Sequence, residues 1–403
     1  MGFSTLLALT VAVYVQDNVG WGLGFGIPSI AMFVSIVVLV AGYPLYIRRK
    51  PGGSPLTRVT QVLVAAVRKR KIQLPCDANL LYQDKELDAD ISTDGRLLHT
   101  NHFTFFDHAA VVTDGDLAET GRPNPWRLST VHRVEELKSI LRILPLWSVG
   151  IFLITAASHN YTFAIVQAKS MDRHLFGSFQ IPAATLNIFS VLPMLLTIVI
   201  YDRVLVPLAR RLTGLDSGIT YLQRMGLGLA ISLFSNISAS VVEYRRRRAA
   251  SMITGRLGAT VPMSVFWLVP QYAVHGIADA FYSVGHMEFI FDQSPESMRS
   301  TAAAIFWLSV ALGNYGGMLL VTMVSNFTKK SKHGNWLQND INKGRLDYYY
   351  WLVASMQVLN FAFYLVCARF YSFKRVEIAG DEIPHNVVDE EARKSEVELV
   401  GIN

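Results

Sequence analysis

The chain has 403 residues, of which 51% are hydrophobic and only 17% are charged, whereas soluble domains carry about a quarter charged residues. The hydrophobic residues fall in long blocks, which argues against a soluble globular protein and indicates a membrane protein. The net charge of +6 does not indicate nucleic-acid binding, because Lys and Arg stand at the ends of the apolar blocks. Its two cysteines, Cys76 and Cys367, offer neither a disulfide framework nor metal-ligand spacing.

The first apolar run covers residues 3–15, and a full-length apolar span at 25–47 follows after a short polar turn. The first run is shorter than the roughly 20 residues that cross a bilayer. No basic residue precedes Arg48 and no small-residue cleavage site follows the run, so a signal peptide is not indicated. We therefore expect an antiparallel helical hairpin whose first helix lacks its N-terminal part.

A polar linker follows the hairpin and extends over residues 48–138. Aliphatic residues between basic ends predict a short helix at the membrane surface over 55–70, and the acidic stretch 84–96 predicts a loop. Ser129 or Thr130 could cap the helix that begins the next span. The many Lys and Arg residues of the linker favour a cytoplasmic location.

Six further spans are predicted after the linker, at 140–165, 184–205, 218–242, 262–289, 301–324 and 348–371. Several contain Pro or Gly, which is common where helices rock around a central site. Alternation from a cytoplasmic linker places the arginine run 245–248 outside, against the positive-inside rule. The tail at 373–403 is polar and acidic, and we expect it to be cytoplasmic and disordered.

Several stretches closely resemble the plant nitrate/peptide transporter family, which is the proton-coupled oligopeptide transporter branch of the major facilitator superfamily. They include "VQDNVGWGLGFGIP", "MDRHLFGSFQIPA", "YDRVLVPLARR", "DQSPESMRSTA" and "NKGRLDYYYWL". The resemblance extends from residue 1 to about residue 371. The "QDNVGWGLG" and "SFQIPA" stretches are most similar to the third plant subfamily, which is associated with nitrite or nitrate and with gibberellin-type hormones.

The resemblance implies an all-α polytopic membrane protein with a major facilitator-type helical bundle. Family members have twelve spans, six on each side of a cytoplasmic linker. On that template residues 1–47 are the fifth and sixth helices, 48–138 the linker, 139–372 the C-terminal six-helix bundle and 373–403 the tail. We therefore expect the chain to be N-terminally truncated and to lack roughly the first four and a half transmembrane helices. The family's glutamate-rich first-span motif for proton coupling does not occur in this sequence.

The span at 262–289 carries the strongest candidate binding residues. Asp279 lies in its middle and His275 is four residues earlier, so both share a helix face. A carboxylate near the bilayer midplane can hold a cationic group or carry a proton, and such residues are functional candidates by default. The family has an acidic residue, usually glutamate, at the Asp279 position. A purely structural pairing of Asp279 with His275 or a nearby hydroxyl is the alternative.

Four residues are candidates for gating. His286 and Glu288 lie toward the cytoplasmic end of the same span. They could form a gate contact, or they could simply belong to a solvated helix end, and the sequence favours neither interpretation. Asp202 and Arg203 resemble the Asp/Arg pairs that clamp neighbouring helix ends in the superfamily.

Three aromatic residues, Tyr161, Trp307 and Tyr315, could line a cavity and contact substrate, although most aromatics in spans only pack. A nitrate site at the histidine position of some relatives is not supported, because that position is Ala157. His159 lies two residues away, on a different helix face.

We therefore expect a proton-coupled secondary transporter of nitrite, nitrate or a gibberellin-like carboxylate, driven by a proton gradient and needing no cofactor. Its partners would be the lipid bilayer, the solute and protons, with no nucleic acid. The plasma membrane is the expected location, with a plastid envelope as the alternative. The first rival is a non-transporting fragment, or a regulatory partner of a full-length homologue. The second is a membrane enzyme or scaffold, for which no catalytic motif or metal set occurs in the sequence.

Overall fold

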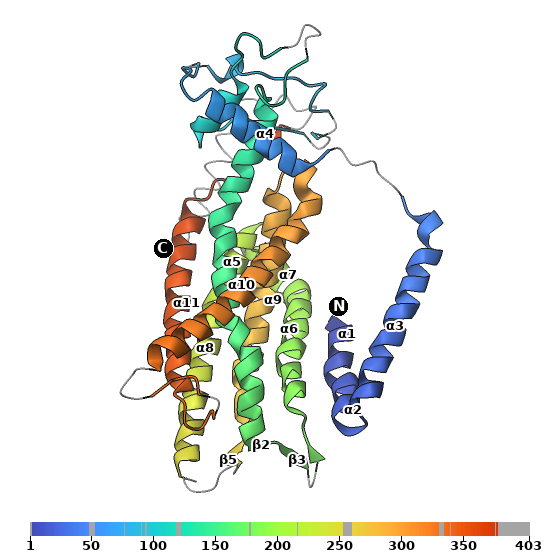
Figure 1. The fold of residues 1–403 in the computed structure, drawn as a ribbon, viewed down its shortest axis with the longest axis vertical. Coiled ribbons are helices and arrows are strands. Elements are labelled where there is room, and N and C mark those ends of the chain that lie inside the picture. The colour runs from blue at the N-terminus through green and yellow to red at the C-terminus, as the bar shows by residue number, and fades with distance from the viewer. Residues whose placement is uncertain are drawn as a thin grey trace. The chain divides into compact units, whose positions relative to one another are not determined.

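The structure is a computed structural model of the chain, and most of what it describes is helical (Figure 1). It describes residues 2–47, 53–75, 77–89, 91–92, 95–117, 122–176, 179–215, 217–252, 260–329, 334–338, 340–374 and 376–377. The basic stop after residue 47, Cys76 and nearly all of the predicted tail lie outside the described residues.

The chain divides into two compact units, and several long helices pass from one unit into the other. The first unit contains Met1–Arg48, Trp147–Phe289 and Phe306–Leu365. The second contains Arg49–Leu146, Ile290–Ile305 and Val366–Asn403.

The predicted N-terminal hairpin is confirmed. Helix α1 (Gly2–Leu7), the π-helical segment η1 (Ala8–Ala12) and α2 (Val13–Asn18) follow one another without a break, and α3 (Trp21–Ala41) returns after a turn (Figure 1). Gly20 in this turn has φ 144°, which a residue with a side chain rarely adopts. The second helix begins and ends earlier than the predicted 25–47. After Ala41 the chain forms the 3₁₀ turn η2 (Tyr43–Leu45), and its Pro44 cannot continue an α-helix.

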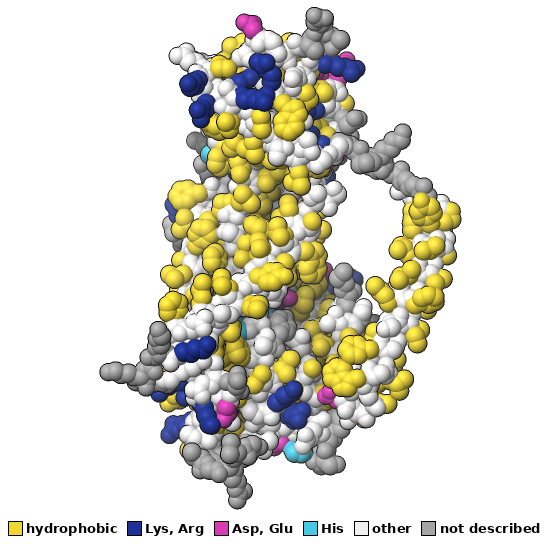
Figure 2. Space-filling view, in the orientation of Figure 1, with side chains coloured by type: hydrophobic (Ala, Val, Ile, Leu, Met, Phe, Trp, Pro, Cys, Tyr) yellow, Lys and Arg dark blue, Asp and Glu magenta, His cyan; other side chains and the backbone are white. Residues whose placement is uncertain are grey.

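The first unit is built around long helices that the apolar blocks predicted. They are α5 (Val131–Ser170), α6 (Ile188–Ile200), η6 (Tyr201–Leu205), α7 (Val206–Thr213), α8 (Tyr221–Ser251), α9 (Val269–Gln293), α10 (Arg299–Thr328) and α11 (Leu346–Arg369). Figure 2 shows hydrophobic side chains over much of the surface of these helices, as expected of side chains that face lipid.

Helix α5 begins where the sequence indicated. The backbone N–H of Arg133 donates to the hydroxyl of Thr130 at 3.4 Å, so Thr130 caps the helix as predicted. The helix has 40 residues and is therefore about 60 Å long, which exceeds the thickness of a bilayer. It extends well beyond the predicted span at 140–165.

Six helical segments in the described part of the chain are long and apolar enough to cross a membrane. They are Trp21–Ala41, Val131–Ser170, Ala183–Thr213, Tyr221–Ser251, Glu296–Thr328 and Leu346–Arg369. Helix α9 is not among them, although its region was predicted as a span. Its histidines, carboxylates and amide side chains lower its hydropathy, and several of them belong to the candidate site below.

Short strands connect the long helices of the first unit at one end. Strand β2 (Met171–Asp172) pairs in parallel with β5 (Val261–Ser264), and β3 (His174–Phe176) pairs antiparallel with β4 (Phe179–Gln180). The 3₁₀ segments η5 (Ala183–Asn187) and η7 (Val265–Leu268) lead into α6 and α9. The predicted span from Pro262 therefore needs correction, because residues 261–268 form β5 and η7 before α9 begins. Pro270 stands in the first turn of α9, where proline is tolerated.

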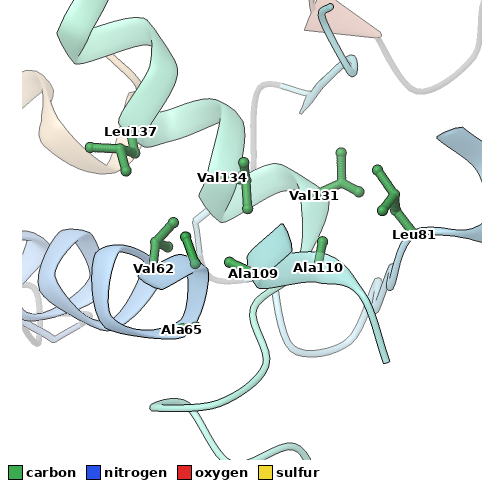
Figure 3. Packing of buried hydrophobic residues seen from close by; sticks show 9 residues of the cluster. Val62, Ala65, Leu81, Ala109, Ala110, Val131, Val134 and Leu137 are labelled. Atoms are coloured by element: carbon green, nitrogen blue, oxygen red, sulfur yellow. The ribbon is translucent and has the colours of Figure 1, made fainter. Parts of the chain in front are cut away.

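The second unit contains the predicted linker helix, α4 (Pro55–Arg68), which confirms a helix in this region. The rest of the unit includes η3 (Ala78–Leu80), β1 (Arg96–Leu97), η4 (Thr104–Ala110), η8 (Glu296–Met298) and β6 (Val376–Glu377), with β1 and β6 paired antiparallel. Helix α4, η4 and the start of α5 share a buried apolar core (Figure 3) that includes Val62, Ala65, Ala109, Val134 and Leu137. The linker is thus a folded unit with its own core, which the sequence analysis did not predict.

Candidate functional site

A polar stripe runs along one face of α9. It consists of Gln271, His275, Asp279, Tyr282 and His286. These residues follow the spacing i, i+4, i+8, i+11 and i+15, which keeps them within about 80° of one another around an α-helix. We call this set the α9 stripe.

Asp279 and His275 form the ionisable centre of the α9 stripe and share a helix face, as their spacing predicted. Both side chains are partly buried and they interact electrostatically. The hydroxyl of Ser283, one turn further along α9, donates a hydrogen bond to Asp279 Oδ1. His159 of α5, which is buried, also lies within electrostatic range of His275. A purely structural role for Asp279 predicted a contact with a nearby hydroxyl, and this contact is present. The hydroxyl is a neutral partner for the carboxylate.

The remaining members of the stripe have buried polar atoms that bond to no described residue. Both amide atoms of Gln271, the Tyr282 hydroxyl and both ring nitrogens of His286 are in this state. Burying a polar group without a partner is costly, so such atoms mark places where water or a ligand bonds. The stripe can thus offer donors and acceptors to a small solute.

Helices α5 and α10 wall the stripe near His286. The His286 ring contacts the rings of Tyr282 and of Phe306 on α10 in tilted arrangements, with centroids 5.2 Å and 5.5 Å away. Gly150 of α5 approaches so closely that a Cβ there would lie 2.8 Å from His286 Cε1 and 2.9 Å from the Tyr282 hydroxyl. Only glycine fits at this position without displacing the stripe.

The structure separates the two gating candidates of α9. His286 belongs to the buried stripe, whereas Glu288 is exposed and lies 3.5 Å from the guanidinium of Arg224 on α8. Two residues on an α-helix are about 200° apart, which explains the separation. Arg224 also stacks over the ring of Tyr201 at 4.0 Å. Glu288 is thus held in a contact between α8 and α9.

Asp202 and Arg203 do not form the expected clamp in the part of the chain that the structure describes. Both are exposed in the π-helical segment η6, and no ion pair joins either of them to another described residue. Their neighbour Tyr201 makes the interhelical contact through Arg224 instead.

The two aromatic candidates whose side chains are described, Trp307 and Tyr315, lie exposed on α10 and not in the buried stripe. Trp307 is 59% exposed and Tyr315 is 72% exposed on α10, where side chains can meet lipid or another protein segment. Tyr161 belongs to α5, but its side chain lies outside the described residues. Gln271 and Tyr282 were missed by the sequence analysis: their spacing places them on the face of Asp279, but only their lack of described bonding partners distinguishes them from packing residues.

A second buried charged site, also missed, lies at the far end of α8. Glu243 and Arg246 are both fully buried, and two hydrogen bonds of 2.8 Å join them. Gln167 of α5 donates to Glu243 at 2.6 Å, and Arg246 donates to Asn342 at 2.6 Å and to the carbonyl of Ile341 at 3.2 Å. Every side-chain nitrogen of Arg246 and both oxygens of Glu243 are bonded.

The same end of α8 explains the unexpected arginine run. Arg246 is paired within the helix, Arg247 forms an ion pair with Asp347, and the Arg245 guanidinium lies 5.0 Å from the ring centre of Trp267. These arginines are held by the protein, so they do not act as free loop charges in the positive-inside rule.

One group in the second unit has the residue types of a metal site. Ligand atoms of His99, Asp107 and Glu135 lie within 4.8 Å of one another. The ammonium of Lys138 lies 2.7 Å from Asp107 and 2.9 Å from Glu135, so a cationic side chain already occupies the centre. This group is a buried ion-pair network and does not suit a metal ion.

Comparisons with known proteins relate the chain to membrane transporters. The family model described as the POT family matches residues 4–337. Protein NRT1/PTR FAMILY 3.1 of Arabidopsis thaliana is 50% identical over 404 residues, which cover 99% of this chain and 68% of that protein. Protein NRT1/PTR FAMILY 8.5 of the same plant is 42% identical over 92% of this chain and 61% of its own length.

Solved structures show the same fold. An auto-inhibited POT family peptide transporter has a TM-score of 0.60 at 19% identity, covering 95% of this chain and 70% of that one. The POT family transporter PepTSo has a TM-score of 0.56 at 21% identity, covering 92% and 69%. The chain therefore spans roughly two thirds of the length of these relatives.

Proposed function

The chain belongs to the POT family, and from this premise we propose that it provides the Asp279 side of the solute site of a proton-coupled secondary transporter. Its relatives are transporters and not enzymes, in keeping with the lack of a catalytic motif in the sequence. The proposed cargo is nitrite, nitrate or a gibberellin-like carboxylate. Each of these is a small anion, and alternating access would carry it across the membrane.

The α9 stripe is the observation that carries this proposal. An ionised Asp279 would repel an anionic solute, whereas a protonated Asp279 would not. The His275 ring, the Gln271 amide and the Tyr282 hydroxyl are hydrogen-bond donors on the same helix face that could hold the anion. Binding of the anion and protonation of Asp279 would therefore favour each other, which is the coupling that symport requires.

The contact between Arg224 and Glu288 suits a gate on another face of α9. It joins α8 to α9 at 3.5 Å, and the Glu288 side chain is half exposed and can leave for water. Arg224 is buried beneath the ring of Tyr201, so an open state must supply another partner or water to its guanidinium. In alternating access, the ion pair between Arg224 and Glu288 would form in one state and break in the other. The residues of the α9 stripe would stay together in both states.

The test is uptake of labelled nitrite, nitrate and gibberellin into proteoliposomes that carry an inward proton gradient. Asp279→Asn keeps the size and the acceptor for Ser283 but cannot exchange a proton, so gradient-driven uptake should fall to background. Asp340→Asn makes the same change in an exposed loop and should leave uptake intact. Equal uptake by the Asp279 variant and the unchanged chain would remove Asp279 from the mechanism.

A second function, pairing with a longer homologue, is favoured by α3. Only 6% of its apolar window is buried, so nearly the whole helix is available to lipid or to other helices. Co-purification of differently tagged short and long chains from one membrane would support pairing. Recovery of the short chain alone would count against it.

We propose the plasma membrane as the location, with a plastid envelope as the alternative that imaging of a tagged chain would distinguish.

A further inference from the structure

Helix α4 has two apolar faces, and only one of them is used by the core of its unit. Val62, Ala65 and Ala66 are buried in that core. On another face Leu56, Leu63 and Val67 are 73%, 37% and 51% exposed. These three positions follow i, i+7 and i+11, which places them within about 40° of one another on the helix surface. We call them the outer stripe of α4.

Basic residues follow the outer stripe at the C-terminal end of α4. Arg68, Arg70 and Lys71 are exposed there, and a guanidinium nitrogen of Arg68 donates to the carbonyl of Trp126 at 3.4 Å. The Trp126 side chain is itself 43% exposed. Figure 2 shows hydrophobic and basic side chains intermixed over the unit that carries α4. Apolar residues, a tryptophan and cations on one surface are the composition of interfacial membrane anchors.

A pocket of about 370 Å³ opens beside these cations. Arg68, Lys69, Ile72, Thr113 and Arg127 line it. Three cationic side chains therefore surround a space large enough for a phosphate group.

Asp116 holds two of the three cations in place. One oxygen accepts from Lys69 at 2.5 Å and from the hydroxyl of Thr113 at 2.6 Å, and the other accepts from Arg127 Nε at 3.1 Å. No described residue accepts a hydrogen bond from the two terminal nitrogens of Arg127, whose side chain is 46% exposed. The pocket thus has an excess of positive charge and donors available to an anion.

We propose that α4 lies on an anionic lipid surface through its outer stripe, and that the pocket binds the headgroup phosphate of one lipid. The charge complementarity favours lipid over a protein partner, because the apolar stripe and the phosphate-sized basic pocket lie next to each other in one short segment. The acyl chains would meet Leu63 and Val67 while the phosphate meets Arg68 and Arg127. The proposal is independent of the solute that the chain transports.

The first test is native mass spectrometry of the full chain in detergent with added phosphatidic acid, phosphatidylcholine or inorganic phosphate. We expect one phosphatidic acid to bind in preference to phosphatidylcholine. Arg68→Gln should weaken it about fivefold, which is the usual contribution of one basic residue at an anionic surface. Lys85→Gln removes an exposed charge elsewhere in the same unit and should change nothing.

Arg127→Gln gives a second variant on the other side of the pocket and should weaken phosphatidic acid similarly. Equal binding of the two lipids, or equal losses in the Arg68 and Lys85 variants, would overturn the proposal. Inorganic phosphate that displaces the lipid completely would assign the pocket to free phosphate and would also overturn it.

The second test addresses the outer stripe in nanodiscs that hold the full chain. Amide hydrogen exchange across residues 56–67 should slow when phosphatidylserine is added to phosphatidylcholine. Leu63→Asn should reverse the slowing without changing exchange in α8. Exchange that is independent of lipid composition would contradict the docking of α4.

Discussion

Two sites with ionisable groups in the first unit differ in how completely their atoms are bonded. At the end of α8, Glu243 and Arg246 are fully buried, and every charged atom has a partner at 3.2 Å or less. On α9, Asp279 accepts from the neutral hydroxyl of Ser283, and its neighbours in the stripe include buried atoms that bond to no described residue. Both sites place ionisable groups in helices of a membrane protein, where their cost is high.

This difference in bonding distinguishes a site that stabilises the fold from a site that is available to bind a solute or a proton. A fully bonded network has nothing left to offer a solute or a proton, and its loss leaves an uncompensated charge. An incompletely bonded site keeps its donors and acceptors available and gives up stability for it. We therefore assign Glu243 and Arg246 to holding α5, α8 and the segment at 341–342 before α11 together, and the α9 stripe to binding.

The largest effect on stability should come from breaking the α8 network. Glu243→Gln leaves the buried guanidinium of Arg246 without its counter-charge, and such losses cost about 3–5 kcal/mol. The melting temperature of the detergent-purified chain should fall strongly. Glu86→Gln makes the same change on an exposed loop and should leave it unchanged.

The double variant Glu243→Leu with Arg246→Met removes both charges and should melt above the single variant, because no unpaired charge stays buried. If the Glu243→Gln variant melts at the same temperature as the unchanged chain, the network does not stabilise the fold. The contrast between the α8 network and the α9 stripe would then be weakened.

Gly150→Ala should give an intermediate loss. The new Cβ would lie within 2.9 Å of Tyr282 and His286, so the stripe must shift, and overpacking of this kind costs about 1–3 kcal/mol. Uptake should fall with it, since both side chains belong to the stripe. Gly26→Ala is the control, because nothing lies within 4 Å of its Cβ. Unchanged melting and uptake in the Gly150 variant would mean that α5 does not wall the stripe.

Asp116 of the second unit is a third carboxylate, and like Glu243 it is fully bonded. Its contribution to stability can be tested by changing the pH. Burial would raise its pKa, but hydrogen bonds from Lys69 and Thr113 outweigh burial and hold the pKa below its usual value. A depressed folded-state pKa stabilises the fold at pH values above the unfolded pKa of about 4, and this contribution is lost as pH falls through the folded value.

Asp116→Asn should therefore lower the free energy of unfolding at neutral pH by about 1.5–3 kcal/mol, the range for a hydrogen bond to a charged group. The difference in unfolding free energy between this variant and the unchanged chain should disappear at acidic pH. Thermal unfolding at several pH values measures it. A gap that stays constant from neutral to acid pH would show that the charge of Asp116 contributes nothing.

The helices were predictable because their apolar blocks are long and uninterrupted. The hairpin, α4 and the start of α5 at Thr130 were all read from local pattern and capping chemistry. The core of the second unit was not, because it joins α4, η4 and α5 across long stretches of polar sequence. Contacts between segments far apart in sequence leave no periodic signal in either of them.

The site was predictable only in its centre. Asp279 and His275 stand out as charges four residues apart in an apolar span. Gln271 and Tyr282 do not, because amides and tyrosines are common in helices and only their lack of bonding partners distinguishes them. The expected clamp of Asp202 and Arg203 on a neighbouring helix end could not be read from local pattern, because it depends on which side chains of another helix lie nearby. In the described part of the chain the contact between η6 and α8 is made by Tyr201 and Arg224.

The smallest effect on stability should come from the most important residue of the proposed site. Asp279→Asn retains an oxygen that accepts from the neutral hydroxyl of Ser283, so the change in unfolding free energy should stay below about 1 kcal/mol. The same acid-to-amide change at Glu243 should be several times more costly. If both variants melt equally low, Asp279 is as structural as Glu243, because bonding would then fail to distinguish the two sites. If the Asp279 variant melts normally while its uptake is lost, the incomplete bonding of the α9 stripe reflects its use in transport.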